Sequence, residues 1–147
     1  MTHPIPIEST LDPALQRELM DTARAVAAHA HAPYSHFHVG AAVLDAGGRI
    51  FGGCNVENAS FGLTLCAERN AVGAAVSAGA NRLRAVAVYG PTPALTAPCG
   101  ACRQVLAEFN PELEVHLFNH EGRHAVYSLA QLLPAGFTFQ NEEPEKP

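Results

Sequence analysis

Three cysteines and one glutamate form the pattern in this chain that is best suited to chemistry. Cys66 and Glu68 stand in the segment Cys-Ala-Glu, and Cys99 and Cys102 stand in the later segment Pro-Cys-Gly-Ala-Cys. Thiolates bind Zn²⁺ well, and three protein ligands on a tetrahedral ion leave one position for water, as in catalytic zinc sites. The pattern therefore predicts a hydrolytic centre with one zinc ion per chain, held by Cys66, Cys99 and Cys102.

Glu68 is the predicted catalytic acid and base. It follows Cys66 by two positions, so it cannot share that residue's direction on a helix. We expect it beside the metal, where it can reach the bound water. An ordinary first-turn helix acid is the alternative, because carboxylates are favoured near helix N-termini. For the three cysteines, the alternative is that they are buried core thiols.

Two further interpretations concern the cysteines. Cys54 could close a four-sulfur site with no open position and no need for Glu68, which describes a non-catalytic zinc-binding interaction module. Its position at the end of a strand-like segment favours a core cysteine instead. Cys99 and Cys102 could also form a redox pair of reactive thiols without metal.

The composition indicates a single globular domain, residues 1–147, that acts on a small molecule. The chain has 147 residues, of which 48% are hydrophobic and 16% charged, and a formal net charge of −5. Its Lys and Arg residues are not clustered, which argues against a nucleic-acid partner because such partners normally require a basic surface. The eight histidines form no convincing second metal site, so we expect solvated or capping roles for them.

The N-terminal segment lacks the basic and apolar regions of a secretion signal. No stretch approaches transmembrane length, so no membrane partner is expected. Four cysteines without a secretion signal favour metal-binding thiols in a reducing cytoplasm over disulfides.

Hydrophobic periodicity and turn residues predict the order helix, hairpin, helix, strand, helix, hairpin. Residues 1–11 are expected to form a loose N-terminal arm, and residues 141–147 a mobile tail. The predicted strands are 39–44, 50–55, 84–89, 113–118 and 125–127. The predicted helices run from 12 to a break at 32–35, from 66 to about 78, from 99 to about 109, and from 129 to 133. This order predicts a mixed five-stranded sheet covered by helices, with both cysteine-bearing helices starting at one edge.

Five ordered segments, spread over most of the chain, resemble the small, homotetrameric cytidine deaminases. They are residues 33–37, 53–59, 66–69, 98–104 and 132–137. The resemblance implies a three-layer α/β/α sandwich and zinc-dependent hydrolysis of cytidine and deoxycytidine to uridine and deoxyuridine plus ammonia, in pyrimidine salvage. It also implies a homotetramer whose active sites are completed across subunit interfaces.

The resemblance assigns substrate contacts to several residues. Asn55 and Glu57 match residues that hydrogen-bond the ribose 3′-hydroxyl, although a turn role after the hairpin is the alternative for both. Phe37 matches an aromatic residue packed near the base and sugar. Phe137 matches a ring that a neighbouring subunit places against the pyrimidine. Without the resemblance, both phenylalanines would be read as core aromatics.

Three more roles follow from the same resemblance. Backbone groups of Ala67 and Pro98 match those that hold the O2 and amino edge of the base. Arg69 matches an arginine that hydrogen-bonds a zinc-bound cysteine, with a solvated helix arginine as the alternative. Arg103 and Gln104 are expected to tie loops together rather than touch substrate.

Two residues depart from the family pattern: His38 stands where proline is usual, and Phe61 where tyrosine is common. These departures concern affinity and assembly more than the type of reaction. Related activities remain open, such as deamination of blasticidin S or of a nucleotide, although no cationic group for a phosphate is evident. Nucleic-acid editing shares the metal pattern, but the acidic charge weighs against it.

Overall fold

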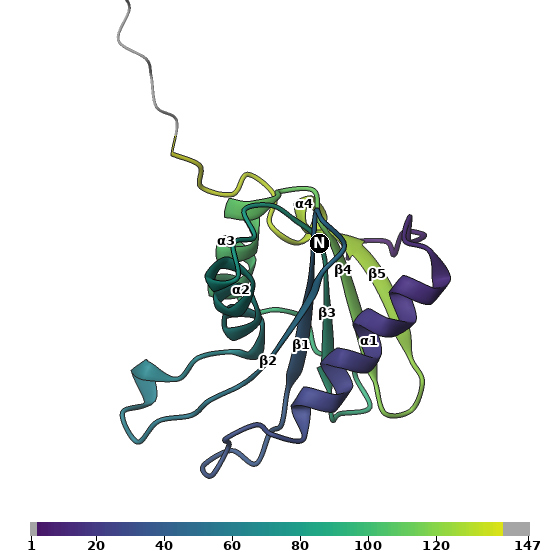
Figure 1. Cartoon of the computed structure of the whole chain (residues 1–147). Coiled ribbons are helices and arrows are strands. Elements are labelled where there is room, and N and C mark those ends of the chain that lie inside the picture. The colour runs from purple at the N-terminus through teal and green to yellow at the C-terminus, as the bar shows by residue number, and fades with distance from the viewer. Residues whose placement is uncertain (1–2, 140–147) are drawn as a thin grey trace, which may run out of the picture.

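The structure, a computed structural model, describes residues 3–139 and contains one five-stranded sheet between layers of helices (Figure 1). The strands lie in the order β2-β1-β3-β4-β5. Their bounds are β1 Gly40–Asp45, β2 Ile50–Cys54, β3 Leu83–Gly90, β4 Glu114–Asn119 and β5 His124–Ser128. Strands β3 and β4 are parallel, whereas the other neighbours are antiparallel. The predicted mixed sheet is therefore confirmed.

Helices cover both faces of this sheet (Figure 1). Helix α1 (Pro13–Ala27) lies on one face, and α2 (Ala67–Ser77) and α3 (Gly100–Phe109) lie on the other. A short α4 (Leu129–Leu132) follows β5, and the 3₁₀ helix η1 (Phe61–Leu63) interrupts the stretch that the sequence predicts as a loop. The three-layer α/β/α sandwich that the resemblance implies is confirmed.

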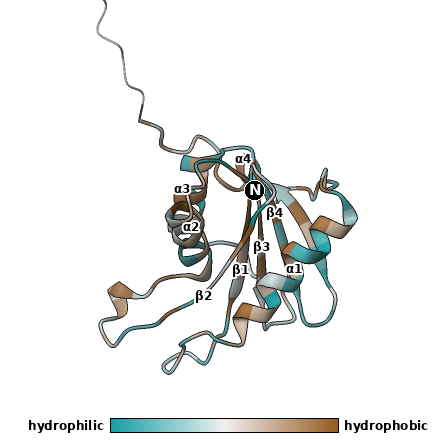
Figure 2. Cartoon of the chain, viewed as in Figure 1, coloured by the Kyte–Doolittle hydropathy of each residue, from teal (hydrophilic) through white to brown (hydrophobic). Residues whose placement is uncertain are grey.

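Alternating side chains on the central strands divide the core into two parts, one on each face of the sheet. In β1, Ala41 and Val43 pack with α2, whereas Ala42 and Leu44 pack with α1. The hydropathy of the chain follows this arrangement, with apolar segments in the central strands (Figure 2). Small residues on the α1 face allow close packing. At Gly40, a Cβ atom would overlap the backbone oxygen of Ala23.

The helix ends follow the predicted capping residues. The side chain of Asp12 accepts a hydrogen bond from the backbone nitrogen of Ala14 at 2.8 Å, with Pro13 at the first helical position. Gly79, just beyond α2, has φ +92°, a conformation that glycine adopts without steric cost. These local signals set where α1 begins and α2 ends.

The N-terminal arm differs from the prediction, because its described part is anchored rather than loose. The backbone nitrogen of Ile7 donates to the carbonyl of Val126 at 2.8 Å. Ser9 and Thr10 hydrogen-bond the carboxylate of Glu114. The predicted mobile tail, 141–147, lies outside the described residues.

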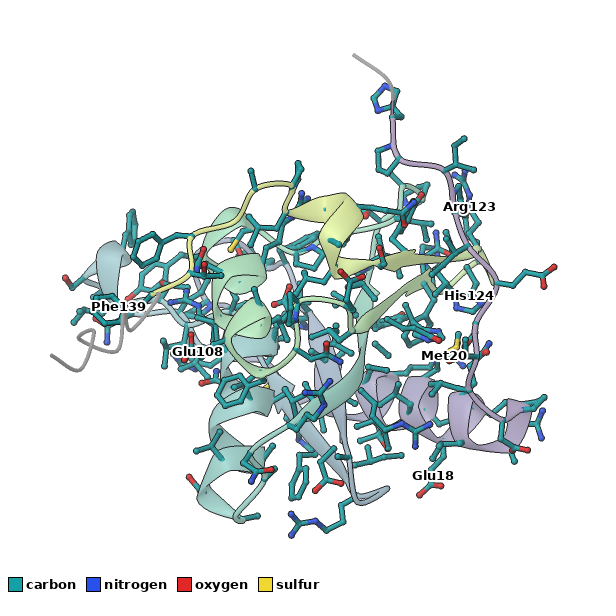
Figure 3. All side chains as sticks on the ribbon, turned by 90° about the horizontal axis from the view of Figure 1, so that it is seen from above. Glu18, Met20, Glu108, Arg123, His124 and Phe139 are labelled. Atoms are coloured by element: carbon teal, nitrogen blue, oxygen red, sulfur yellow. The ribbon has the colours of Figure 1, made fainter. Side chains whose placement is uncertain are left out.

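The prediction of solvated or capping histidines is wrong for His116, which is completely buried in β4. Its Nε2 atom lies 3.0 Å from the Glu114 carboxylate, and its Nδ1 atom lies 3.2 Å from Nε2 of His124. Figure 3 shows His124 and Met20 on the α1 side of the sheet, far from Phe139 beyond α3. A polar network thus stands among apolar neighbours on this face.

Among residues 3–139, no helix combines the length and the apolar character that crossing a membrane requires.

Candidate metal and catalytic site

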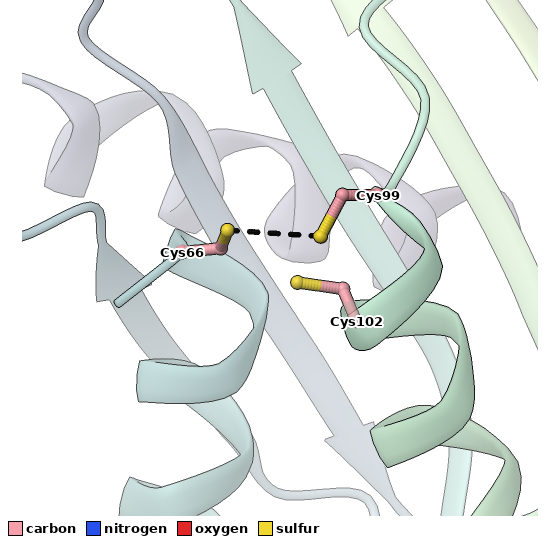
Figure 4. Close-up of side chains that lie close together, drawn as sticks. All are labelled: Cys66, Cys99 and Cys102. Carbon is pink, nitrogen blue, oxygen red and sulfur yellow. Dashed lines mark hydrogen bonds between the residues drawn. The ribbon is translucent and has the colours of Figure 1, made fainter. Parts of the chain in front are cut away.

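The N-terminal ends of α2 and α3 bring three cysteine sulfurs together (Figure 4). Cys66 is the N-cap of α2, Cys99 is the N-cap of α3, and Cys102 lies in the first turn of α3. The Sγ atoms of Cys66 and Cys99 are 3.8 Å apart, and all three Sγ atoms lie within 4.8 Å of one another. The spacing in the sequence thus becomes one compact group of thiols.

The geometry of these thiols fits zinc. Two sulfurs that each lie about 2.3 Å from a tetrahedral ion are about 3.8 Å apart, which matches the separation of Cys66 and Cys99. The free N–H groups at the start of a helix also favour negative charge nearby. Because both helices begin at a cysteine, their positive ends stabilise the thiolates that a metal requires.

Cys54 does not belong to this group of mutually close thiols. It ends β2 and is half-buried, and its carbonyl accepts a hydrogen bond from Nδ2 of Asn70 at 2.8 Å. Cys99, by contrast, is exposed, which speaks against the alternative of a buried core thiol. Three sulfurs rather than four therefore face a common point.

Glu68 lies in the first turn of α2 and is only 4% exposed. Burial raises the pKa of its carboxyl group, and the nearby negative charge of Cys66 raises it further. A carboxyl group with a raised pKa is a better proton donor and acceptor for groups that titrate above the usual carboxyl range. Its position and environment are those expected of an acid and base.

Arg69 extends across the start of α2 to the thiol group. Its Nη2 atom lies 3.6 Å from the Sγ atom of Cys66 and donates to the carbonyl of Thr64 at 3.3 Å. The hydrogen bond to Cys66 raises the pKa of Arg69. Hydrogen bonds from Cys102 and Arg69 lower the pKa of Cys66 to about 5, against an opposing effect of burial. Negative charge therefore concentrates on Cys66.

A close approach of β2 to α2 sets the position of the site. A Cβ atom at Gly53 would overlap the backbone nitrogen of Ala71 and lie 2.7 Å from the carbonyl of Ala67. Asn70 adds its hydrogen bond to Cys54 across the same contact. Asn70 was missed by the sequence analysis. Its only signal was an asparagine within a helix, where this residue type is intrinsically unfavourable.

Asn55 and Phe37 are brought together, as the resemblance implies, but through the backbone. Asn55 Nδ2 donates to the carbonyl of Phe37 at 2.7 Å, and Asn55 Oδ1 accepts from the nitrogen of Val39 at 2.9 Å. Phe37 is partly buried and packs against the core on the α2 side of the sheet. Asn55 thus fixes the segment that carries Phe37.

Glu57 lies beside a cavity of about 460 Å³ whose lining also contains Tyr34, Ser35, Phe61 and Thr64. Its Oε1 atom accepts from the backbone nitrogens of Tyr34 and Ser35 at 3.0 and 3.1 Å. The hydrogen bond from the Ser35 hydroxyl is the main effect that lowers the pKa of Glu57. Thr64, which lines the cavity, accepts a hydrogen bond through its carbonyl from Arg69, and Arg69 contacts Cys66.

Ala67 and Pro98, to which the resemblance assigns contacts with the edge of the base, lie at or just before the starts of α2 and α3. Ala67 is completely buried and Pro98 is buried. The carbonyl of Pro98 accepts a hydrogen bond from Arg103 Nε at 2.8 Å, and Arg103 Nη1 donates to the carbonyl of Leu132 at 2.6 Å. Arg103 therefore ties loops together, as predicted.

Phe137 is not placed against the thiols of its own chain. Its side chain is 73% exposed, and it lines a cavity of about 90 Å³ with Ala107 and Pro111. Gln104 Nε2 donates to the carbonyl of Phe137 at 2.9 Å, which confirms that Gln104 holds a loop. The two residues that depart from the family pattern, His38 and Phe61, are both exposed.

The chain is similar to known proteins over most of its length. The family model for the cytidine and deoxycytidylate deaminase zinc-binding region matches residues 13–116. A cytidine deaminase of Sporosarcina psychrophila is 47% identical over 110 residues, which are 74% of this chain and 81% of that protein. One from Mycobacterium tuberculosis is 48% identical over 120 residues, with 81% and 86% covered.

Solved structures agree with these matches. The crystal structure of a cytidine deaminase from Burkholderia pseudomallei superposes with a TM-score of 0.79 and 49% sequence identity, covering 82% of this chain and 98% of that one. The cytidine deaminase of Mycobacterium tuberculosis gives a TM-score of 0.73 at 42% identity, with 84% and 98% covered. The chain thus belongs to the family of zinc-binding cytidine and deoxycytidylate deaminases.

Proposed function

We propose that this protein hydrolyses cytidine and deoxycytidine to uridine and deoxyuridine plus ammonia, in pyrimidine salvage. The observation that carries this proposal is the position of Glu68. Its carboxyl group is buried in the turn that follows Cys66, where three sulfurs converge. Similarity to cytidine deaminases over most of the chain supports the choice of substrate.

Cys66, Cys99 and Cys102 would hold one Zn²⁺ through their Sγ atoms. When bound, the ion supplies an acidified water as the nucleophile. Arg69 offsets the negative charge of the three thiolates, because its guanidinium contacts Cys66 directly. The helix N-termini act in the same direction.

Glu68 moves two protons during the reaction. Its carboxylate first takes a proton from the attacking water and delivers it to N3 of the cytosine, which makes C4 more electrophilic. It then transfers the second proton of that water to the leaving amino group, which departs as ammonia. The same carboxylate is therefore base and then acid. Its raised pKa suits both steps.

Nucleoside binding would use the residues to which the resemblance assigns substrate contacts. Asn55 and Glu57 would hydrogen-bond the ribose 3′-hydroxyl, and Phe37 would contact the base and sugar. The backbone of Ala67 and Pro98 would hold the edge of the base. A site that uses the 3′-hydroxyl accepts deoxycytidine as well as cytidine.

We also propose a homotetramer in the cytoplasm, with Phe137 completing the site of a neighbouring subunit. Exposed apolar side chains support an assembled state, with 72% of Phe61, 66% of Leu63 and 73% of Phe137 accessible in the single chain. Figure 2 shows the apolar colour at η1, which projects from the body of the molecule. The free thiols suit a reducing compartment.

Loss of cytidine absorbance, followed with and without a zinc chelator, tests the proposed function. We expect turnover of cytidine and deoxycytidine that the chelator abolishes and added zinc restores. Cytidine monophosphate and blasticidin S, assayed in parallel, should react much more slowly. Faster turnover of either compound would reassign the substrate, and free titratable thiols at Cys99 and Cys102 without zinc would favour a redox protein.

A further inference from the structure

The backbone of Phe37 is hydrogen-bonded through both of its polar groups. Its N–H donates to Oγ of Ser35 at 3.0 Å, and its carbonyl accepts from Nδ2 of Asn55 at 2.7 Å. The backbone N–H of Ser35 in turn donates to Oε1 of Glu57 at 3.1 Å. A continuous chain of hydrogen bonds therefore runs from Glu57 through Ser35 to Phe37 and on to Asn55.

The segment needs this support, because it contains a strained residue. His36 has φ +56°, in the left-handed region that is sterically unfavourable for a residue with a side chain. The residues around it, 33–36, are exposed and form no ladder with a strand. Hydrogen bonds with Ser35, Asn55 and Glu57 thus hold the backbone of this segment, and with it the Phe37 ring, in one position.

We propose that Ser35 is a positioning residue: Glu57 holds its backbone N–H, and its hydroxyl holds the backbone of Phe37, which sets how tightly the nucleoside is bound. This rests on the proposed function, in which Phe37 contacts the base and sugar. Asn55 and Glu57 then have two tasks, since each holds the Phe37 segment and also faces the sugar. An amide nitrogen carries two hydrogens, so Asn55 can donate to the Phe37 carbonyl and to a sugar hydroxyl together.

Substitution of Asn55 or Glu57 would remove both tasks at once, whereas Ser35→Ala removes the support and leaves both side chains in place. The matched control is Ser77→Ala, at an exposed position at the end of α2. Ser35→Thr restores a hydroxyl and is the rescue variant. Zinc content and circular dichroism establish that every variant is folded.

Two measurements on the zinc-loaded protein test the proposal. We expect Ser35→Ala to speed hydrogen exchange at the Phe37 amide about fivefold and to lower kcat/KM for cytidine about fivefold, mainly through KM. Ser35→Thr and Ser77→Ala should stay within about twofold of the wild type. In a Phe37→Ala background, Ser35→Ala should cost less than about twofold, because its effect passes through the ring.

Unchanged exchange at the Phe37 amide in Ser35→Ala would overturn the proposal. The proposal would also be overturned if the fold-losses of kcat/KM in Ser35→Ala and Phe37→Ala multiplied in the double variant. That result would show that Ser35 acts independently of the ring. Wild-type protein that fails to turn over cytidine would instead contradict the proposed function and overturn the nucleoside-binding role of Ser35. The exchange measurement would still report whether the hydroxyl holds the segment.

Discussion

The guanidinium of Arg69 lies 3.6 Å from the sulfur of Cys66, at the point where α2 begins. The same Nη2 atom is fixed by the carbonyl of Thr64 at 3.3 Å. A cation held in this way stabilises a thiolate before any metal binds, which lowers the cost of gathering three negative sulfurs. The contact therefore links the loop after β2 to the electrostatics of the site.

Replacement of Arg69 should make Cys66 a weaker acid. In the zinc-free protein, the hydrogen bond from Cys102 and the contact with Arg69 bring the pKa of Cys66 to about 5. We expect the pH midpoint of Cys66 alkylation, followed by peptide mass spectrometry, to rise in Arg69→Gln. Cys54→Ala is the control, in which we expect the pH midpoint of Cys66 alkylation to be unaltered. An identical midpoint in Arg69→Gln would show that the contact carries no charge stabilisation.

Glu68→Gln should separate catalysis from metal binding. The amide fills the space of the carboxylate but cannot accept and donate the proton, so we expect kcat to fall about 10²- to 10⁴-fold. Zinc content, measured by atomic emission, should stay near one ion per chain. Wild-type turnover in zinc-loaded Glu68→Gln would remove Glu68 from the mechanism.

Acid should destabilise the fold through the buried network on β4. Burial lowers the pKa of His116 below the usual value of about 6.5. Below that value the unfolded chain binds a proton that the folded chain resists, so stability present above pH 6.5 is lost as the pH falls through the folded pKa. We expect urea unfolding with excess zinc to give a lower free energy at pH 5.5 than at pH 7.5.

This difference should shrink in His116→Gln and persist in the control His29→Gln, an exposed position in the loop after α1. Equal pH dependence in wild type and His116→Gln would assign the acid sensitivity to other groups. Burial also opposes ionisation of Glu114, but hydrogen bonds from Thr10 and Ser9 lower its pKa overall. The contribution of Glu114 is therefore lost only at more acidic pH.

Exposed apolar residues on η1 should be needed for assembly. Leu63 is 66% exposed, so a charge there costs little in a monomer but much in an apolar interface. We expect Leu63→Glu to reduce the mass measured by analytical ultracentrifugation and to lower activity with it. Ala46→Glu, in the turn between β1 and β2, is the control. A Leu63→Glu protein with the wild-type mass and full activity would exclude η1 from the interface.

Much of the fold follows from local patterns in the sequence. Asp12 and Pro13 start α1 and Gly79 ends α2, because caps and turns depend on a few adjacent residues. The apolar segment 39–44 is predicted as a strand, and the side chains of β1 pack on both faces of the sheet. The thiol group is likewise predictable, since Cys66 and Cys99 each begin a helix that follows a strand or loop.

Contacts between distant segments were not predictable in this way. The anchor of Thr10 on Glu114 and the burial of His116 depend on which strands lie side by side. A turn role was the alternative for Asn55 and Glu57, but their partners in the backbone of residues 34–39 could not be named from the sequence. Polar side chains that serve the backbone have no periodicity, so they become visible only when the chain is folded.

The central claim is that three sulfurs hold zinc and leave one position open for water. X-ray absorption at the zinc edge of the purified protein tests it most directly, with Cys54→Ala as a matched control. We predict three sulfur neighbours at about 2.3 Å and one oxygen neighbour, unchanged in Cys54→Ala. Four sulfur neighbours would contradict this claim. A purified protein that binds no zinc even when zinc is supplied would also contradict it.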